Sequence, residues 1–69
     1  MKRYSVELYF YKDPHESKGY KTEPVLEEYS AETIASDVFA YDWASAEKKL
    51  LSERKDIAYI HVIEVSEQF

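Results

Sequence analysis

Carboxylates are the most numerous side chains of this chain that could act as acids, bases or ligands. Residues 22–47 contain seven of them and no Lys or Arg. These residues, called here the acidic belt, are Glu23, Glu27, Glu28, Glu32, Asp37, Asp42 and Glu47. Evenly spaced carboxylates without countercharge could imitate the phosphates of a duplex and occupy a basic cleft of a nuclease, polymerase or CRISPR complex. The alternative is a solvated surface that maintains solubility, and a net charge of only -5 favours it.

The spacing of the acidic and histidine side chains matches no catalytic or metal-binding motif. Glu27 and Glu28 are adjacent, so on a strand they face opposite ways and cannot cooperate as a pair. His15 and His61 have no third ligand type at a suitable spacing, and the chain has no Cys. We expect His61 to be a sheet residue that meets Tyr9 across strands. The sequence therefore predicts no enzymatic activity, no metal and no cofactor.

Tyrosine is the second residue type that points to binding. The chain has seven Tyr, three Phe and one Trp, and 16% of its residues are aromatic. A Tyr ring combines apolar area with a hydroxyl that needs water or a partner, which is common at binding surfaces. Single-stranded nucleic acid also stacks on such rings. The chain lacks the basic groove that supplies most of the affinity for nucleic acid, so the sequence favours a protein partner.

Two alternating segments predict the strands that position these side chains. Residues 3–11 form the first, and we expect it to be the central strand. One face of it would carry Tyr4, Val6, Leu8 and Phe10, and the other Ser5, Glu7, Tyr9 and Tyr11. Residues 57–65 form the second. Its two faces would carry Ala58, Ile60 and Val62, and Tyr59, His61, Ile63 and Val65.

Residues 33–41 fit either a strand or the first part of a long helix. As a strand, they place Asp37, Phe39 and Tyr41 on one face. As a helix, they align Phe39 with Trp43 at i and i+4. Asp42 favours the strand, because it is a good N-cap for a helix that runs from Trp43 to about residue 54.

The remaining segments predict loops. Residues 12–19 include a turn signal and Gly19, which suits a positive φ angle. In residues 20–31, Pro24 excludes a central strand. We expect either an extra short edge strand there or an ordered loop packed by Val25 and Leu26. Residues 66–69 are expected to form a fraying tail.

The elements together predict a single α+β domain over residues 1–69, with the order β-β-α-β. The simplest arrangement is a small three-stranded antiparallel sheet with the first strand in the middle and one helix on one face. The uncovered face would then carry Tyr9, Tyr11, Phe39, Tyr41, Tyr59, His61 and Ile63. That face is too apolar for free solvent, unless residues 20–31 fold over it and turn it into ordinary core.

The setting predicted for the chain is cytoplasmic. No segment resembles a signal peptide, and no apolar run approaches the roughly 20 residues that span a bilayer. A chain of this size without disulfides is more typical of the cytosol than of a secreted scaffold. We therefore expect no membrane partner.

Residues 38–65, VFAYDWASAEKKLL followed after a turn by IAYIHVIEV, resemble a pattern in small early proteins of tailed bacteriophages. These include compact β-β-α-β inhibitors that bind host RNA polymerase. The shared pattern is a strand ending in Val-x-Ala, a capping polar residue, a helix with Ala in its first turns, and a closing strand rich in Val and Ile. The resemblance implies a protein that acts in the host cytoplasm by binding a larger host protein.

The predicted function is that of a non-enzymatic protein-binding module, an inhibitor or modulator of a larger host or cellular protein. The predicted contact residues combine the aromatic face with the acidic belt. They are Tyr9, Tyr11, Phe39, Tyr41, Tyr59, His61, Glu27, Glu28 and Asp37. Two alternatives stay open: a structural homodimer that uses the same face, and a single-strand nucleic-acid binder.

Overall fold

Three strands, one α-helix and one short 3-10 helix make up the fold, described here from a computed structural model for residues 1–13, 15 and 18–67. The strands are β1 (Lys2–Tyr11), β2 (Tyr29–Ala40) and β3 (Ile57–Glu67). The α-helix α1 (Trp43–Glu53) connects β2 to β3, and the 3-10 helix η2 (Leu26–Glu28) precedes β2. The order is the predicted β-β-α-β, and the structure confirms that residues 33–40 belong to a strand.

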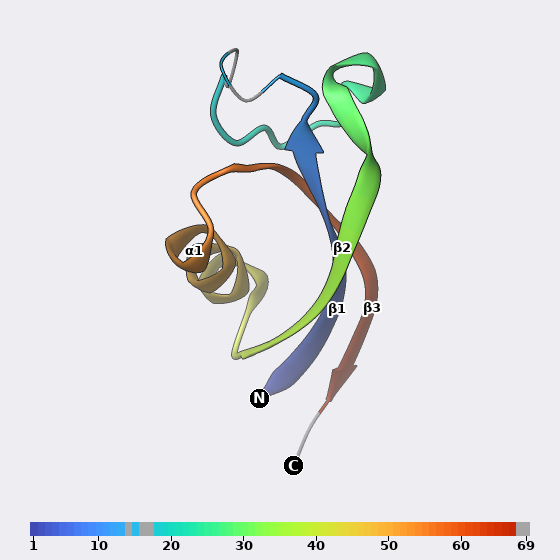
Figure 1. The fold of residues 1–69 in the computed structure, drawn as a ribbon. Helices are drawn as coiled ribbons and strands as arrows, with labels where there is room; N and C mark the ends of the chain where they lie inside the picture. Colours follow the sequence, from blue (N-terminus) through green and yellow to red (C-terminus); the bar gives the residue numbers. More distant parts are fainter. Residues whose placement is uncertain (14, 16–17, 68–69) are drawn as a thin grey trace.

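The sheet has the order β2-β1-β3, and β1 is antiparallel to both neighbours. The first strand is therefore central, as its alternating pattern predicted. Figure 1 shows α1 against one face of the curved sheet, and the crossover through α1 leaves β2 and β3 parallel to each other. The α+β class and the single helix on one face are confirmed.

The core lies between α1 and the helix-side face of the sheet. Alternate residues of β1 are buried there, together with residues of every other major element. The buried cluster consists of Tyr4, Val6, Leu8, Val38, Ala40, Ala46, Leu50, Ile57 and Ile60. The Tyr4 and Trp43 rings lie 5.5 Å apart between their centroids, which docks the start of α1 on β1. These apolar contacts hold the helix on this face.

The start of α1 is fixed by Asp42, as the sequence predicted. Asp42 has extended backbone angles, and its carboxylate accepts the backbone N–H of Ser45 at 2.8 Å. This hydrogen bond satisfies a helix N–H that has no partner within the helix. The same bond holds the pKa of the Asp42 carboxyl below its usual range.

Replacing Asp42 with Ala is expected to lower the urea midpoint at pH 7. The folded-state pKa of Asp42 is depressed. The contribution of Asp42 to stability is therefore present above the unfolded pKa, about 3.9, and is lost as the pH falls through the folded pKa. The difference in urea midpoint between the wild type and Asp42→Ala should therefore narrow below about pH 4. Asp42→Asn is the control, because it keeps the cap acceptor but does not titrate. An equal gap at pH 7 and pH 3 would contradict this account.

A bulge in β3 changes which side chains share a face. Ile63 is an extra residue of β3 opposite the step from Ser5 to Val6 in β1. Beyond the bulge, Val65 pairs with Tyr4, whose side chain is buried on the helix side. The prediction that Val65 lies on the uncovered face with Ile63 is therefore wrong, because the regular two-residue alternation does not continue through the bulge.

The segment before β2 differs from its prediction in what packs it. Leu26 is 72% exposed and Val25 is also exposed, so these two residues do not anchor the loop. The strand begins at Tyr29, four residues before the predicted start, and Tyr29 is buried. The strand ends at Ala40, so Tyr41 lies beyond the sheet rather than on its face.

The loop position of Gly19 and the C-terminal tail are closer to their predictions. Gly19 has a φ of 80°, the left-handed conformation for which glycine is suited. The predicted tail is shorter than expected, because Ser66 and Glu67 pair with β1 as part of β3. Residues 68–69 of that predicted tail lie outside the described residues.

Candidate protein-binding face

The sheet surface opposite α1, called here the far face, is the candidate site. The pairing registers place its residues in rows across β2, β1 and β3. From the upper end of the sheet in Figure 1 to the lower, the rows are Thr33–Tyr9–Tyr59, Ala35–Glu7–His61, Asp37–Ser5–Glu64 and Phe39–Arg3–Ser66. Figure 1 shows no element covering the lower rows. The far face is thus aromatic at one end and mixed polar and apolar at the other.

A tyrosine cluster occupies the upper end of the far face. The Tyr29 ring stacks on Tyr59, with an interplanar angle of 9° and a centroid separation of 6.0 Å. It also contacts the rings of Tyr9 and Tyr11, each at 6.0 Å. Tyr29 is only 2% exposed, so it is the centre of a small second core on the side of the sheet away from α1.

The segment that precedes η2 closes over this cluster. The Lys21 backbone N–H donates to the Ala58 carbonyl on the edge of β3 at 2.8 Å. The Tyr29 hydroxyl then donates to the Glu23 carbonyl at 3.2 Å. Residues 21–29 therefore pass from the edge of β3 across the end of the far face to β2, consistent with Figure 1.

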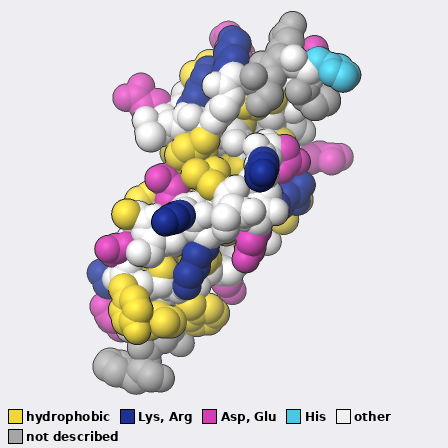
Figure 2. All heavy atoms as spheres, turned by 90° about the vertical axis from the view of Figure 1, so that its left-hand side faces the viewer, with side chains coloured by type: hydrophobic (Ala, Val, Ile, Leu, Met, Phe, Trp, Pro, Cys, Tyr) yellow, Lys and Arg dark blue, Asp and Glu magenta, His cyan; other side chains and the backbone are white. Residues whose placement is uncertain are grey.

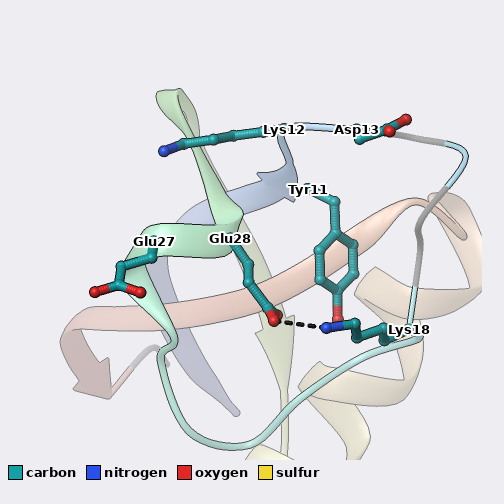
Figure 3. Close-up of a pocket in the computed structure, with 6 residues that line it drawn as sticks. All are labelled: Tyr11, Lys12, Asp13, Lys18, Glu27 and Glu28. Atoms are coloured by element: carbon teal, nitrogen blue, oxygen red, sulfur yellow. Dashed lines mark hydrogen bonds and ion pairs between the residues drawn. The ribbon is translucent and has the colours of Figure 1, made fainter.

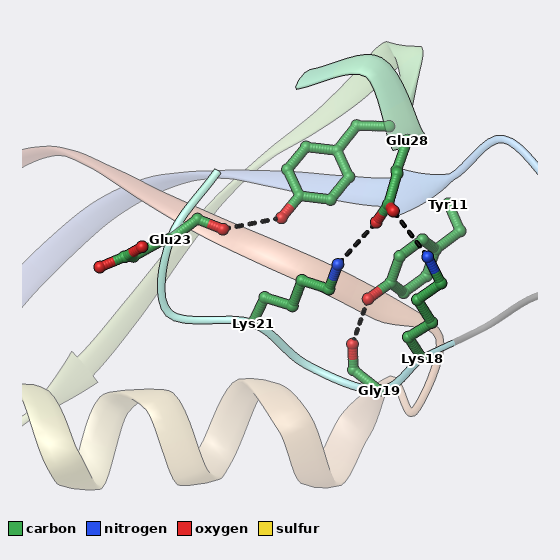
Figure 4. A network of polar contacts seen from close by, with 7 residues as sticks. Tyr11, Lys18, Gly19, Lys21, Glu23 and Glu28 are labelled. Atoms are coloured by element: carbon green, nitrogen blue, oxygen red, sulfur yellow. Dashed lines mark hydrogen bonds and ion pairs between the residues drawn. The ribbon is translucent and has the colours of Figure 1, made fainter. Parts of the chain in front are cut away.

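Ion pairs hold the same segment in place. Figure 4 shows the Glu28 carboxylate between the ammonium groups of Lys18 and Lys21, at 2.7 and 2.6 Å. These two cations hold the pKa of Glu28 below its usual range, and Glu28 raises that of Lys21. Nearby, the Tyr11 hydroxyl donates to the Gly19 carbonyl.

Tyr20 lies on the other side of the β3 edge, against the core. Its hydroxyl donates to the Glu47 carboxylate of α1 at 2.8 Å. Burial, and then this carboxylate, raise the pKa of the Tyr20 hydroxyl above its usual range. Tyr20 therefore ties the loop to α1.

The tyrosines of the predicted contact set are thus not a free aromatic surface. Tyr9, Tyr11 and Tyr59 are half-buried around Tyr29. The alternative that residues 20–31 cover the uncovered face holds at this end of the sheet. The physical reason is that a small domain gains stability by burying aromatic area that one helix cannot reach.

A small pocket remains where the tyrosine cluster meets the open part of the far face. It has a volume of about 240 Å³ and is lined by Tyr9, Pro24, Leu26, Tyr59 and His61. Three of these residues belong to the predicted contact set. The pocket can accept an apolar side chain between two ring edges and the exposed Leu26 side chain.

The lower far face keeps large apolar side chains in solvent. Ile63 is 55% exposed and Phe39 is 46% exposed. Between the strands that carry them, the Ser5 hydroxyl donates to the Asp37 carboxylate at 2.9 Å. Glu64 pairs with Ser5 from the other side. Exposed apolar groups therefore alternate with carboxylates on this part of the sheet.

His61 has a different neighbour from the predicted one. It pairs with Glu7 across the strands, and Tyr9 pairs with Tyr59 instead. The distance from His61 Nδ1 to Glu7 Oε1 is 3.7 Å. The pairs from Val6–Val62 to Tyr9–Tyr59 are in continuous register, which puts His61 opposite Glu7, two residues from Tyr9. His61 thus contributes a polar rim to the pocket rather than an aromatic stack.

The acidic belt does not form one continuous surface. Asp42 caps α1, Glu47 accepts from Tyr20, and Glu28 is paired with Lys18 and Lys21. The remaining members are exposed and lie on different segments: Glu23, Glu27, Glu32 and Asp37. The carboxylates are thus distributed over several segments, which agrees with the solvated surface that the net charge favours.

Glu27 and Glu28 lie in η2, within the segment for which an ordered loop was one of the two predicted alternatives. A pocket of about 260 Å³ beside them is lined by Tyr11, Lys12, Asp13, Lys18, Glu27 and Glu28. Figure 3 shows Glu28 turned toward Lys18 while Glu27 points away from it. Only Glu27 of this pair is available for a partner's cation.

The charges on the two sides of the sheet differ. The helix side carries charges of both signs, with the exposed Lys48, Lys49, Arg54 and Lys55 beside Asp42, Glu53 and Asp56. Figure 2 shows dark blue Lys and Arg side chains among magenta Asp and Glu side chains on this side. On the far face, Glu7, Asp37 and Glu64 surround the exposed apolar residues, and Arg3 is the cation among its paired rows. The paired rows of the far face therefore carry more carboxylates than cations.

The described part of the chain contains no group of three His, Asp or Glu side chains that could hold a metal ion. Across those same residues, no helix is long and apolar enough to cross a membrane. Comparisons with protein-family models, with curated proteins and with solved structures found no match. The resemblance of residues 38–65 to phage early proteins therefore stays a prediction.

Two residues of the candidate site were not singled out by sequence reasoning. Leu26 was assigned to loop packing, although a Leu beside Glu27 and Glu28 with no apolar periodicity around it fits an exposed position equally well. Tyr29 was placed in a segment without a regular pattern, and its burial depends on Tyr59, thirty positions further along. No local signal indicates such a contact.

Proposed function

We propose that this chain is a non-enzymatic protein-binding module that engages a larger protein through the far face of its sheet. The observation that carries the proposal is the exposure of Phe39 and Ile63 on the lower far face, which no described element covers, with Leu26 exposed at the pocket above them. Large apolar side chains left in solvent beside a pocket are typical of an interaction site.

The partner fits best if it combines apolar and basic side chains. An apolar side chain would enter the pocket beside Leu26, and Lys or Arg groups would meet Glu7, Asp37 and Glu64 around it. A central apolar contact with a charged rim is the usual composition of a protein interface. The net charge of -5 would also speed the encounter with a basic surface.

A small module with one such face can act by occupying a surface on a larger protein. Inhibition or modulation of a host polymerase, nuclease or defence complex in the cytoplasm is the activity that the phage resemblance implies. The exposed carboxylates of the far face support a basic target of this kind. Catalysis plays no part in this proposal.

Replacing Ile63 with Ser is the sharpest test, and Val65→Ser is its matched control. The two residues lie on one strand and are similarly exposed, at 55% and 48%, but the bulge places them on opposite faces. Tagged protein would be used to capture partners from a lysate of the source or host cell. We expect one protein to be retained by the wild type and by Val65→Ser, and its retention to fall about tenfold or more with Ile63→Ser, because burying an Ile contributes about 1.5–3 kcal/mol.

Equal capture by all three proteins, or capture of nothing, would refute the proposal. If the melting temperature of the purified wild type depends on concentration and that of Ile63→Ser does not, the result would instead support the homodimer, in which the far faces of two copies cover each other. Thermal melts of each variant show whether it folds, so that a loss of binding is not confused with unfolding.

A further inference from the structure

β2 lies at an edge of the sheet and has one side without a neighbouring strand. The order β2-β1-β3 places it there. Residues 33–40 pair with β1 in unbroken register, from Thr33 opposite Tyr9 to Ala40 opposite Lys2. An edge strand of this kind presents a regular row of backbone N–H and C=O groups to solvent. Such a row is a template for one more strand.

The free part of this edge has defined limits. At its lower end, the Lys49 ammonium of α1 donates to the Phe39 carbonyl at 2.6 Å. At its upper end, the Glu32 N–H donates to the Ser30 hydroxyl at 3.1 Å. Between them, no backbone hydrogen bond from outside the sheet reaches residues 33–37 among the residues that the structure describes. We call residues 33–37 the open edge.

The two outer edges of the sheet are not equivalent. On β3, the Lys21 N–H already bonds to the Ala58 carbonyl, and bulges interrupt the strand near Ala58 and at Ile63. β2 has no such bulge in residues 33–40, and it contains neither Lys nor Pro. Bulges, Lys and Pro are the usual devices that prevent a strand from being added. The open edge lacks all three.

Charge decides which kind of strand fits. Glu32 directly precedes the open edge and Asp37 is its last residue; both are exposed, and β2 has no basic residue. A second copy would bring further carboxylates against them, at a net charge of -5 for each chain. A segment with Lys or Arg in its alternate positions would instead place opposite charges beside them.

We infer that the open edge binds an extended basic segment of another protein as a fourth strand of the sheet. The inference rests on the proposed function and names the form of the partner. The added strand would lie beside Ala35 and Asp37 and would continue the far face outward. Backbone hydrogen bonds would supply the pairing, and the charges of Glu32 and Asp37 would supply the preference for basic residues.

The test is an NMR titration of the full chain with the capped peptide Lys-Val-Lys-Val-Lys-Val-Lys. We expect saturable amide shifts and slower amide exchange centred on residues 33–37. Ala35→Lys adds a cation at the open edge and should weaken binding about tenfold or more. Ala44→Lys makes the same change on the exposed surface of α1 and should bind as the wild type does. The same peptide methylated on alternate backbone nitrogens should not bind, which tests the pairing without altering the protein.

Three outcomes would overturn the inference. They are no binding of the peptide, equal binding of its Glu-for-Lys counterpart, and shifts centred on the far-face pocket instead of the open edge. Self-association of the protein alone that Ala35→Lys abolishes would make a second copy the occupant. If no peptide binds but Ile63→Ser still loses the captured protein, the proposed function stands and only this inference fails.

Discussion

Replacing Tyr29 with Ala is expected to lower the free energy of unfolding by about 3–5 kcal/mol, the usual cost of truncating a buried aromatic side chain. Tyr29 is almost fully buried and contacts the rings of Tyr9, Tyr11 and Tyr59. The truncation leaves a cavity between the tyrosine cluster and the loop segment that covers it. Because a domain of this size has a total stability of about 3–5 kcal/mol, the variant should be largely unfolded at 25 °C.

Urea denaturation followed by circular dichroism measures this effect. Tyr29→Phe is the matched control, since it keeps the ring and removes only the hydrogen bond to the Glu23 carbonyl. We expect Tyr29→Phe to cost about 1 kcal/mol. If Tyr29→Ala were no less stable than Tyr29→Phe, the tyrosine cluster would not be part of the core.

Replacing Leu50 with Ala should release α1 from the sheet, at a cost of about 2–5 kcal/mol. Leu50 and Ala46 are the fully buried residues of this helix, and Trp43 and Leu51 are only partly buried beside them. With so few anchors, the loss of Leu50 removes much of the apolar area that holds α1 in place.

Leu51→Ala offers a control on the same helix with the same change in composition. Leu51 is half-buried, so its truncation should cost less than that of Leu50. Urea midpoints from far-UV circular dichroism, with Trp43 fluorescence as a second probe, distinguish the two. Equal midpoints for both variants would show that the helix is not anchored through Leu50.

The sequence predicted the parts of this fold that depend on local patterns. The alternation of residues 3–11 survives in β1, where Tyr4, Val6 and Leu8 are buried. Asp42 marked the start of α1 because an N-cap needs only the N–H groups of the next turn. Once these elements were placed, the crossover through α1 required β2 and β3 to be parallel, and the simplest arrangement put β1 between them, as observed.

The features that the sequence did not predict depend on pairing between distant segments. The bulge at Ile63 arises from the register between β1 and β3, and no residue type in β3 indicates it. For this reason Val65 was assigned to the wrong face, and the pairing of His61 with Glu7 likewise depends on the register between β1 and β3. Tyr29 was missed for the same reason, because its burial requires Tyr59 and the Glu23 carbonyl to meet it in space.

The candidate site was predicted in part. Phe39 lies exposed on the far face, as its place in the strand suggested. Tyr9, Tyr59 and His61 line one pocket there, but Tyr11 lies in the tyrosine cluster and Tyr41 beyond the end of β2. Whether a partner contacts these residues stays a prediction, to be tested through Ile63 and Val65.

The central place of β1 makes folding depend on contacts between distant segments. Lys2 pairs with Ala40 on one side and with Glu67 on the other. β1 precedes both partner strands in the chain, so the sheet cannot be completed until β3 has been synthesised. Contacts between distant segments also slow folding. The apolar residues of β1 are therefore expected to stay exposed until β3 joins the sheet.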